Sequence, residues 1–156
     1  MLKKWFGTQL DVGSKAPEFR LPDQNGAVRS LSENLGKWVV LYFYPKDETP
    51  GCTAEACSFR DEFAMFQNLN AVVMGVSTDS IESHAKFASS NALQFSVLSD
   101  STKETCKNYG VLNPLGFANR VTFLIDPKGV IRDVLTWVSW STYGKTVQDR
   151  LVALQK

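Results

Sequence analysis

Two of the three cysteines in this 156-residue chain, Cys52 and Cys57, lie five residues apart just after Thr49-Pro50-Gly51. Threonine is a preferred N-cap residue and proline is preferred at the first helical position, so Cys52 is expected in the first turn of a helix. The N–H groups of that turn have no partner inside the helix, and their positive partial charge favours a thiolate. Because the thiolate is the nucleophilic form of cysteine, the sequence predicts a reactive sulfur at Cys52.

The same turn suits a small polar substrate. Gly51 would let a substrate approach the backbone closely, and the hydroxyl of Thr49 can both donate and accept a hydrogen bond beside the sulfur. The alternative is that Cys52 only packs in the core, because free cysteine is among the most buried residue types. The cap, the proline and the position after an apolar run together favour the reactive interpretation.

The composition narrows the classes of function. With 17 basic and 16 acidic residues and no long run of one sign, the chain is not expected to bind nucleic acid. No window approaches the roughly 18 apolar residues of a membrane span, so a soluble, cytoplasmic protein is expected. Three cysteines are too few, and odd in number, for a secreted disulfide framework. His84 is the only histidine and no metal-ligand spacing accompanies it, so no metal or other cofactor is expected.

The elements that must position these residues alternate between strands and helices. Continuous apolar runs predict four buried strands, at residues 38–44, 71–76, 95–98 and 121–125. Apolar residues at three- and four-residue steps, with their caps, predict four helices, at residues 52–69, from Asp79 or Ser80 to about 88, 101–109 and 142–154.

Two turn signals add hairpins to this pattern. Asn25-Gly26 predicts an N-terminal hairpin, and Asp126-Pro127-Lys128-Gly129 predicts a turn that joins the strand at 121–125 to one at 130–138. Strands that alternate with helices predict a three-layer α/β/α sandwich around a mixed sheet. Without repeats or linkers, the chain is expected to form one domain over residues 1–156, with 1–12 as a loosely ordered segment.

The residues around Cys52 resemble those of a known family. The pattern Pro45-x-x-x-Thr49-x-x-Cys52 after a buried strand, together with Arg120 at the start of RVTFLID, resembles the peroxiredoxin family. The stretch YPKDETPGCTAEAC, which includes Cys57, resembles the bacterioferritin-comigratory or Q-type branch of that family. The resemblance implies a monomeric, thioredoxin-like thiol peroxidase without a metal or haem, which reduces hydrogen peroxide and small organic hydroperoxides.

The resemblance also implies roles for single residues. Cys52 would be the peroxidatic cysteine, which attacks one peroxide oxygen and becomes a sulfenic acid. Arg120 would hold the thiolate and polarise the peroxide, Thr49 would orient it, and Pro45 would limit access of water. Cys57 would be the resolving cysteine, which forms an intramolecular disulfide that thioredoxin or a similar donor reduces.

Helix geometry places a condition on the two cysteines. Five residues along an α-helix separate the Cα atoms by about 8.6 Å, whereas a disulfide needs them within roughly 7 Å. If Cys57 resolves, the first turns of the helix must unwind after oxidation. A segment from Thr49 to about Arg60 is expected to unwind, because its small side chains anchor it weakly before Phe59. Alternatively, Cys57 is only a packed helix residue.

Other candidates carry weaker signals. Cys106 has no role in the family pattern and is expected to be a spectator, while Asp79, Asp100 and Asp126 are expected to cap helices or turns. Trp137 and Trp140 are either hairpin and core aromatics or part of a shallow apolar surface where a reductant docks.

Two rival functions would also use a pair of cysteines. A disulfide oxidoreductase normally uses C-x-x-C, whereas four residues separate Cys52 from Cys57. In a redox sensor or binding module, a single oxidation would expose the unwound segment to a partner. The loop before Arg120, GVLNPLGFAN, is short and uncharged where many branch members have a longer basic segment.

Overall fold

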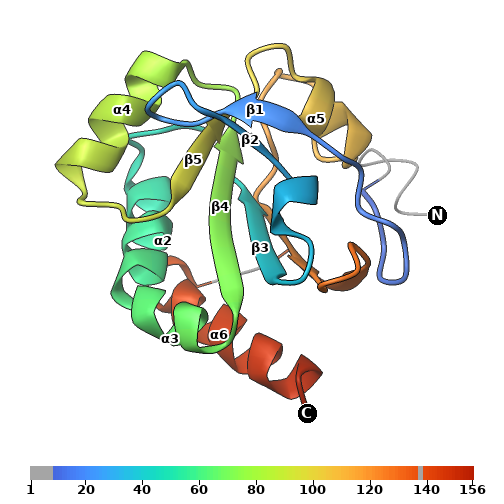
Figure 1. Ribbon diagram of the computed structural model, residues 1–156. Helices are drawn as coiled ribbons and strands as arrows, with labels where there is room; N and C mark the ends of the chain where they lie inside the picture. The colour runs from blue at the N-terminus through green and yellow to red at the C-terminus, as the bar shows by residue number, and fades with distance from the viewer. Residues whose placement is uncertain (1–8, 137–138) are drawn as a thin grey trace.

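A five-stranded mixed sheet forms the centre of the molecule in the computed structural model, which describes residues 9–136 and 139–156 (Figure 1). The strand order is β5-β4-β3-β6-β7, with β3 and its two neighbours at the middle. Strands β3, β4 and β5 are parallel, whereas β6 and β7 run antiparallel to their neighbours. The bounds are β3 Trp38–Phe43, β4 Ala71–Ser77, β5 Ser96–Ser99, β6 Val121–Ile125 and β7 Ile131–Leu135.

Every residue of β3 is buried, because both faces of the sheet are covered. Val40 and Tyr42 point into the core that the helices α2, α3, α4 and α6 close, and Val39 and Leu41 point into the core on the other face. The first set of helices comprises α2 Pro50–Asp61, α3 Phe63–Asn68, α4 Ile81–Ser90 and α6 Tyr143–Leu154. On the other face lie α5 Glu104–Asn108 and the strands β1 Arg20–Pro22 and β2 Val28–Ser30 (Figure 1).

The predicted hairpin at Asn25-Gly26 is confirmed. Strands β1 and β2 pair antiparallel as a small separate sheet, and Gly26 has a φ of 81° in the turn between them. The central strands lie within one or two residues of the predicted runs, and β7 ends at Leu135, with residues 137–138 outside the described residues. The 3-10 turns η1 Ser32–Asn34 and η2 Trp140–Thr142 were not anticipated.

The prediction of one long helix over residues 52–69 was wrong. At Glu62 the backbone leaves helical geometry, with φ −101° and ψ 12°, and its N–H bonds the carbonyl of Phe59. The break redirects α3 along the start of β4, so that Phe66 and Phe59 are both buried in the same core. The helix predicted at 101–109 is shorter, because Lys103 takes a left-handed φ of 68° and α5 begins only after it.

None of the described helices is long and apolar enough to cross a membrane. The extent of a single domain remains a prediction. Residues 1–8 of the segment expected to be loosely ordered lie outside the described residues.

Candidate active site

The turn at the start of α2 places Cys52 as the sequence predicts. Thr49 occupies the N-cap position with an extended backbone, Pro50 is the first helical residue, and Cys52 is third and only 1% exposed. The N–H of Cys52 has no hydrogen-bond acceptor among the described residues. A buried sulfur therefore lies beside an unused backbone donor.

The hydroxyl of Thr49 does not cap the helix, contrary to the sequence prediction. Its Oγ1 donates instead to the carbonyl oxygen of Lys46 at 2.9 Å, which closes the loop between β3 and α2. This bond commits the hydroxyl proton and leaves the oxygen of Thr49 free to accept.

Arg120 reaches the sulfur because of the antiparallel pairing of β6 with β3. Val121 pairs with Phe43 at the end of β3, so the residue before it lies next to the start of α2. The Nη2 of Arg120 donates to the Sγ of Cys52 at 3.3 Å, across 68 residues of sequence. The side chain of Arg120 is 20% exposed, so the contact is partly shielded from solvent. A guanidinium at this distance stabilises negative charge on the sulfur.

Glu55 is a member of the site that the sequence analysis missed. It is fully buried one turn after Cys52, and its Oε1 accepts from the Nη1 of Arg120 at 2.6 Å. Burial raises the pKa of the Glu55 carboxyl to about 7, although Arg120 acts in the opposite direction. Glu55 and Cys52 thus take two arms of one guanidinium and fix its orientation. The three-residue spacing, which puts both side chains on one helix face, could have identified Glu55.

Trp140 forms a wall beside this site. Its ring lies 5.6 Å from the guanidinium carbon of Arg120, in cation–π geometry, and the residue is 50% exposed. A Cβ at Gly51 would lie 3.0 Å from the same ring, so the tryptophan packs closely on the glycine. Trp140 is therefore neither a core residue nor remote from Cys52. Trp137, proposed with it, lies outside the described residues.

Cys57 faces away from Cys52. Its half-buried sulfur donates to the Oδ1 of Asn91, the residue that ends α4, at 3.7 Å. Arg60 adds a second link to the same place, donating to the carbonyl oxygen of Asn91 at 2.9 Å. All three cysteines are free thiols.

The segment expected to be weakly anchored before Phe59, from Thr49 to about Arg60, is held more firmly at Ser58 than the sequence predicts. The Oγ of Ser58 accepts the N–H of Gly144 at 2.9 Å, and a Cβ at Gly144 would lie 2.3 Å from the carbonyl oxygen of Ser58. The backbones of α2 and α6 are thus in direct contact. From Ser58 onward α2 is held by this contact as well as by buried Phe59.

Pro45 is half-buried directly after Tyr44, on the loop that leads to α2. Cys106 lies in α5, in the core on the other face of the sheet from Cys52. Burial, together with Asp100, raises the pKa of the Cys106 thiol far above its usual range.

Comparison with known proteins decides the family. The model of the AhpC/TSA family matches residues 12–134, which is most of the chain. The chain belongs to the AhpC/TSA family. Peroxiredoxin Bcp of Bacillus subtilis is 44% identical over 129 residues, covering 77% of this chain and 81% of that protein.

Two solved peroxiredoxin structures support the same placement. A mutant of Xylella fastidiosa PrxQ superimposes with a TM-score of 0.91 at 31% identity, covering 96% of this chain and all of the other. The bacterioferritin comigratory protein of Xanthomonas campestris, studied for its alkyl peroxide reduction, superimposes with a TM-score of 0.86 at 29% identity, covering 94% and 98%. The predicted thioredoxin-like fold and the resemblance to the bacterioferritin-comigratory and Q-type peroxiredoxins are confirmed. The protein is an oxidoreductase, a thiol peroxidase.

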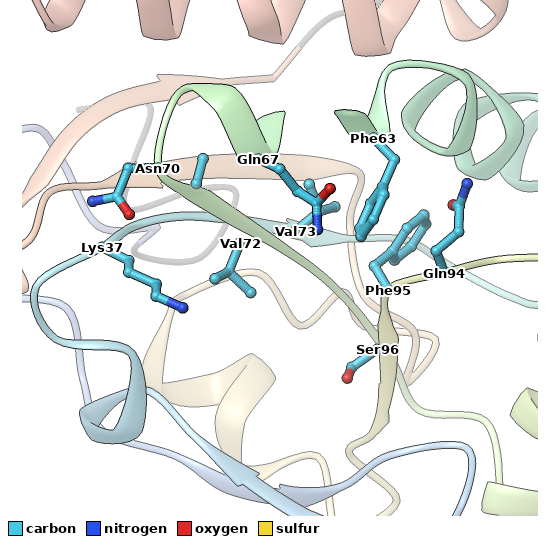
Figure 2. A pocket seen from close by; sticks show the side chains of 10 residues that line it. Lys37, Phe63, Gln67, Asn70, Val72, Val73, Gln94, Phe95 and Ser96 are labelled. Atoms are coloured by element: carbon cyan, nitrogen blue, oxygen red, sulfur yellow. The ribbon is translucent and has the colours of Figure 1, made fainter. Parts of the chain in front are cut away.

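A cavity of about 370 Å³ lies elsewhere on this peroxiredoxin (Figure 2). It opens at the start of β4 and β5, whereas Cys52 follows the carboxyl end of the parallel strand β3. Lys37 is the one ionisable side chain in its lining, which otherwise consists of amide, hydroxyl and apolar groups such as Gln67, Phe63 and Phe95. No cysteine lines this cavity, whereas the sulfur of Cys52 lies in the turn at the start of α2.

Proposed function

We propose that this peroxiredoxin reduces hydrogen peroxide and small organic hydroperoxides at Cys52. The observation that carries the proposal is the contact of Arg120 with the sulfur of Cys52, in a turn where the backbone N–H of Cys52 is unpaired among the described residues. The thiolate attacks one peroxide oxygen, the O–O bond breaks, and the departing oxygen takes a proton to leave as water or an alcohol. The sulfur is oxidised to a sulfenic acid as the peroxide is reduced.

Each neighbouring group has a part in this step. Arg120 keeps its charge throughout and offers its donors to the sulfur and to the peroxide. Because the proton of Thr49 is committed to Lys46, its oxygen accepts from the peroxide O–H and orients the peroxide. The N–H of Cys52 donates where negative charge develops, and Pro45 limits access of water.

We propose that Cys57 then resolves the sulfenic acid. Its thiolate attacks the sulfur of Cys52, a disulfide forms and water leaves. The contact of Cys57 with Asn91 holds it away from Cys52, so α2 must unwind first. The contact of Ser58 with Gly144 supports an unwound segment that ends before Ser58, shorter than the one first predicted.

The proposal includes a dithiol donor, thioredoxin or a similar protein, that attacks the disulfide and restores both thiols. We also propose that the enzyme acts as a monomer in the cytoplasm, where thiol donors keep cysteines reduced.

Mass spectrometry after one equivalent of hydrogen peroxide tests the sequence of steps. We expect a disulfide between Cys52 and Cys57 in the wild type, and a sulfenic acid at Cys52 that dimedone traps in Cys57→Ser. Cys106→Ser is the matched control and should form the same disulfide as the wild type. A disulfide to Cys106 would refute the resolving role of Cys57, and an unoxidised Cys52 would refute the whole proposal. Repeated turnover with thioredoxin and its reductase separates an enzyme from a sensor that is oxidised once.

Amide hydrogen exchange tests the unwinding. After oxidation we expect the amides of residues 53–61, whose helical acceptors lie in residues 49–57, to lose protection, while the amide of Gly144, which donates to the Oγ of Ser58, keeps it. Protection that stays the same throughout α2 would contradict the unwinding. Loss of protection at the amide of Gly144 as well would contradict the boundary of the unwound segment at Ser58.

A further inference from the structure

A buried polar cluster lies behind the loop that connects β3 to α2. Its centre is Asp47, which is 3% exposed although it lies on a loop. The Oδ1 of Asp47 accepts from the hydroxyl of Tyr44 at 2.6 Å. Its Oδ2 faces the hydroxyl of Ser83 at 2.8 Å and the Nδ1 of His84 at 2.7 Å. The loop is therefore tied to α4 by a carboxylate with three partners.

His84 has a hydrogen-bond partner at each ring nitrogen. Its Nε2 lies 2.9 Å from the carbonyl oxygen of Leu98, which can only accept, so this nitrogen carries a proton. The Asp47 carboxylate accepts two hydroxyl protons and acts as an acceptor toward Nδ1 as well. With Asp47 ionised, both ring nitrogens donate and His84 is an imidazolium, a charge state that its nitrogen-15 spectrum tests below. Removing one partner of such a pair leaves an uncompensated buried charge.

Asp79 holds the backbone of Asp47. Its Oδ2 accepts the N–H of Asp47 at 2.8 Å and the hydroxyl of Ser77 at 2.6 Å. Asp79 thus does not cap a helix, and Ser80 caps α4 instead. Oxygen and nitrogen atoms of Asp47, Asp79 and His84 lie within 4.8 Å of one another, but hydrogen bonds already occupy both nitrogens of His84. The cluster is built to hold the loop.

The loop needs to be held because it is strained. Glu48, directly after Asp47, has a φ of 68°, a left-handed conformation that is unfavourable for a residue with a Cβ. The next residue is Thr49, whose hydroxyl donates to Lys46 on the other side of Asp47. A relaxed Glu48 would move the carbonyl of Lys46 relative to the hydroxyl of Thr49. The anchor, the strained residue and the substrate-orienting hydroxyl are consecutive in the chain.

We propose that the ion pair of His84 with Asp47 positions Thr49 for peroxide reduction. The pair holds Glu48 in its left-handed conformation and keeps the hydroxyl of Thr49 donating to the carbonyl oxygen of Lys46, so that the oxygen of Thr49 accepts from the peroxide. His84 never touches the substrate and acts as a positioning residue. This inference rests on the function proposed for Cys52 and adds a specific cause for the orientation of its substrate.

The first test compares two reactions of the same sulfur. Peroxide needs Thr49 for its orientation, whereas alkylation of Cys52 by iodoacetamide needs only the sulfur. In His84→Gln we expect the second-order rate with hydrogen peroxide to fall at least about tenfold, as small displacements of an orienting group do. The alkylation rate of Cys52, followed by mass spectrometry of its peptide, should change less than about threefold.

The two rates separate this inference from the proposed function. An equal fall in both rates would show that His84 has only a structural role. An unchanged peroxide rate would show that His84 does not position Thr49. A wild-type Cys52 that does not react with peroxide would instead overturn the proposed function itself.

The second test uses the strain at Glu48. Asparagine tolerates the left-handed conformation better than most residues, so Glu48→Asn in the His84→Gln protein should recover at least about threefold of the peroxide rate. Glu48→Gln, which retains the strain, is the matched control and should recover nothing. Equal recovery by both substitutions would overturn the link between the anchor and the loop. If His84→Gln fails to fold, Glu48→Val in the wild type provides the same comparison, with a slower peroxide reaction and an unchanged alkylation rate.

The charge of His84 has a direct spectroscopic readout. Because the chain has one histidine, the imidazole signals in a nitrogen-15 spectrum belong to His84 without assignment. We expect both ring nitrogens to couple to a proton at neutral pH in the wild type. A proton on one nitrogen alone would contradict the buried ion pair.

Discussion

Cys52 and Cys106 occupy the same helical position with opposite surroundings. Each is the third residue of a helix that follows a parallel strand, and each is buried. Cys52 receives a hydrogen bond from Arg120, and its own N–H is unpaired among the described residues. The N–H of Cys106 donates to the Oδ2 of Asp100 at 2.8 Å, so a carboxylate takes up the backbone donor that is unpaired at Cys52.

The comparison shows that neither the helix start nor burial makes a cysteine reactive. Burial and the carboxylate of Asp100 both raise the pKa of Cys106, so this thiol stays protonated. At Cys52 a guanidinium donates to the sulfur instead, and the unpaired N–H remains available to a substrate. The neighbouring charge distinguishes the two sites.

Removing that charge should have the largest effect. In Arg120→Met we expect the rate of Cys52 with hydrogen peroxide to fall by about 10²–10³-fold, the usual effect of losing one preorganised donor. The rate of Arg120→Lys should lie between those of Arg120→Met and the wild type. An ammonium keeps the charge but cannot donate to Glu55 and Cys52 at once through a rigid fork. Stopped-flow measurement under single-turnover conditions gives the rate. A rate for Arg120→Met close to that of the wild type would mean that the charge of Arg120 is not what distinguishes Cys52 from Cys106.

The balance of charge around Arg120 should be visible as a pH dependence of stability. Because the pKa of Glu55 is raised from an ordinary 4.5 to about 7, its contribution to stability is fully present below pH 4.5 and is lost as the pH rises through about 7. The loss is on the order of 3 kcal/mol at most. Glu55→Gln, which cannot ionise, should lack this part of the pH dependence.

Urea unfolding of the reduced wild type and of Glu55→Gln, at about pH 5 and about pH 8, measures the difference. Other carboxyl groups titrate in both proteins, so only the difference between them reports on Glu55. Parallel pH profiles would show that Arg120 keeps Glu55 ionised throughout, in which case the two cysteine sites differ by an ion pair and not by a cation alone.

The sequence predicted the position of Cys52 at the start of a helix but not all of what surrounds it. The cap, proline and strand context located Cys52, since these are local signals within a few residues. The strands and the hairpin at Asn25-Gly26 were predicted for the same reason. Arg120 was proposed only through the family resemblance, because nothing local in the sequence shows that β6 pairs with β3.

Non-local contacts explain what the sequence analysis missed. Asp47 and His84 are 37 residues apart, and their pairing depends on how α4 packs behind the loop. The break at Glu62 depends on the path of β4, and the firm hold on Ser58 depends on Gly144 in the last helix. Glu55 is the exception, because its spacing from Cys52 was visible in the sequence and only its partner was not.

Asp100 should matter for stability and not for peroxide reduction. Its carboxylate accepts the N–H groups of Thr105 and Cys106, as an N-cap residue does. In Asp100→Ala we expect the free energy of unfolding to fall by about 1–2 kcal/mol while the peroxide rate of Cys52 stays the same. Chemical denaturation and stopped-flow kinetics on one preparation measure both. Asp100→Asn retains an acceptor and should cost less. A slower peroxide reaction would contradict the independence of the two sites.

Replacing Cys106 itself should have the smallest effect. In Cys106→Ala the loss of one buried sulfur should cost about 1 kcal/mol of stability, comparable to other small deletions in a core. We expect peroxide turnover to be unchanged, because Cys106 packs against the opposite face of the sheet and would have to cross it to reach Cys52. Iodoacetamide should label Cys106 in the wild type only as fast as the protein opens, so labelling should accelerate with denaturant. Labelling of native protein at the rate of an exposed thiol would show that the environment around Asp100 does not suppress this cysteine, and the contrast with Cys52 would then rest on Arg120 alone.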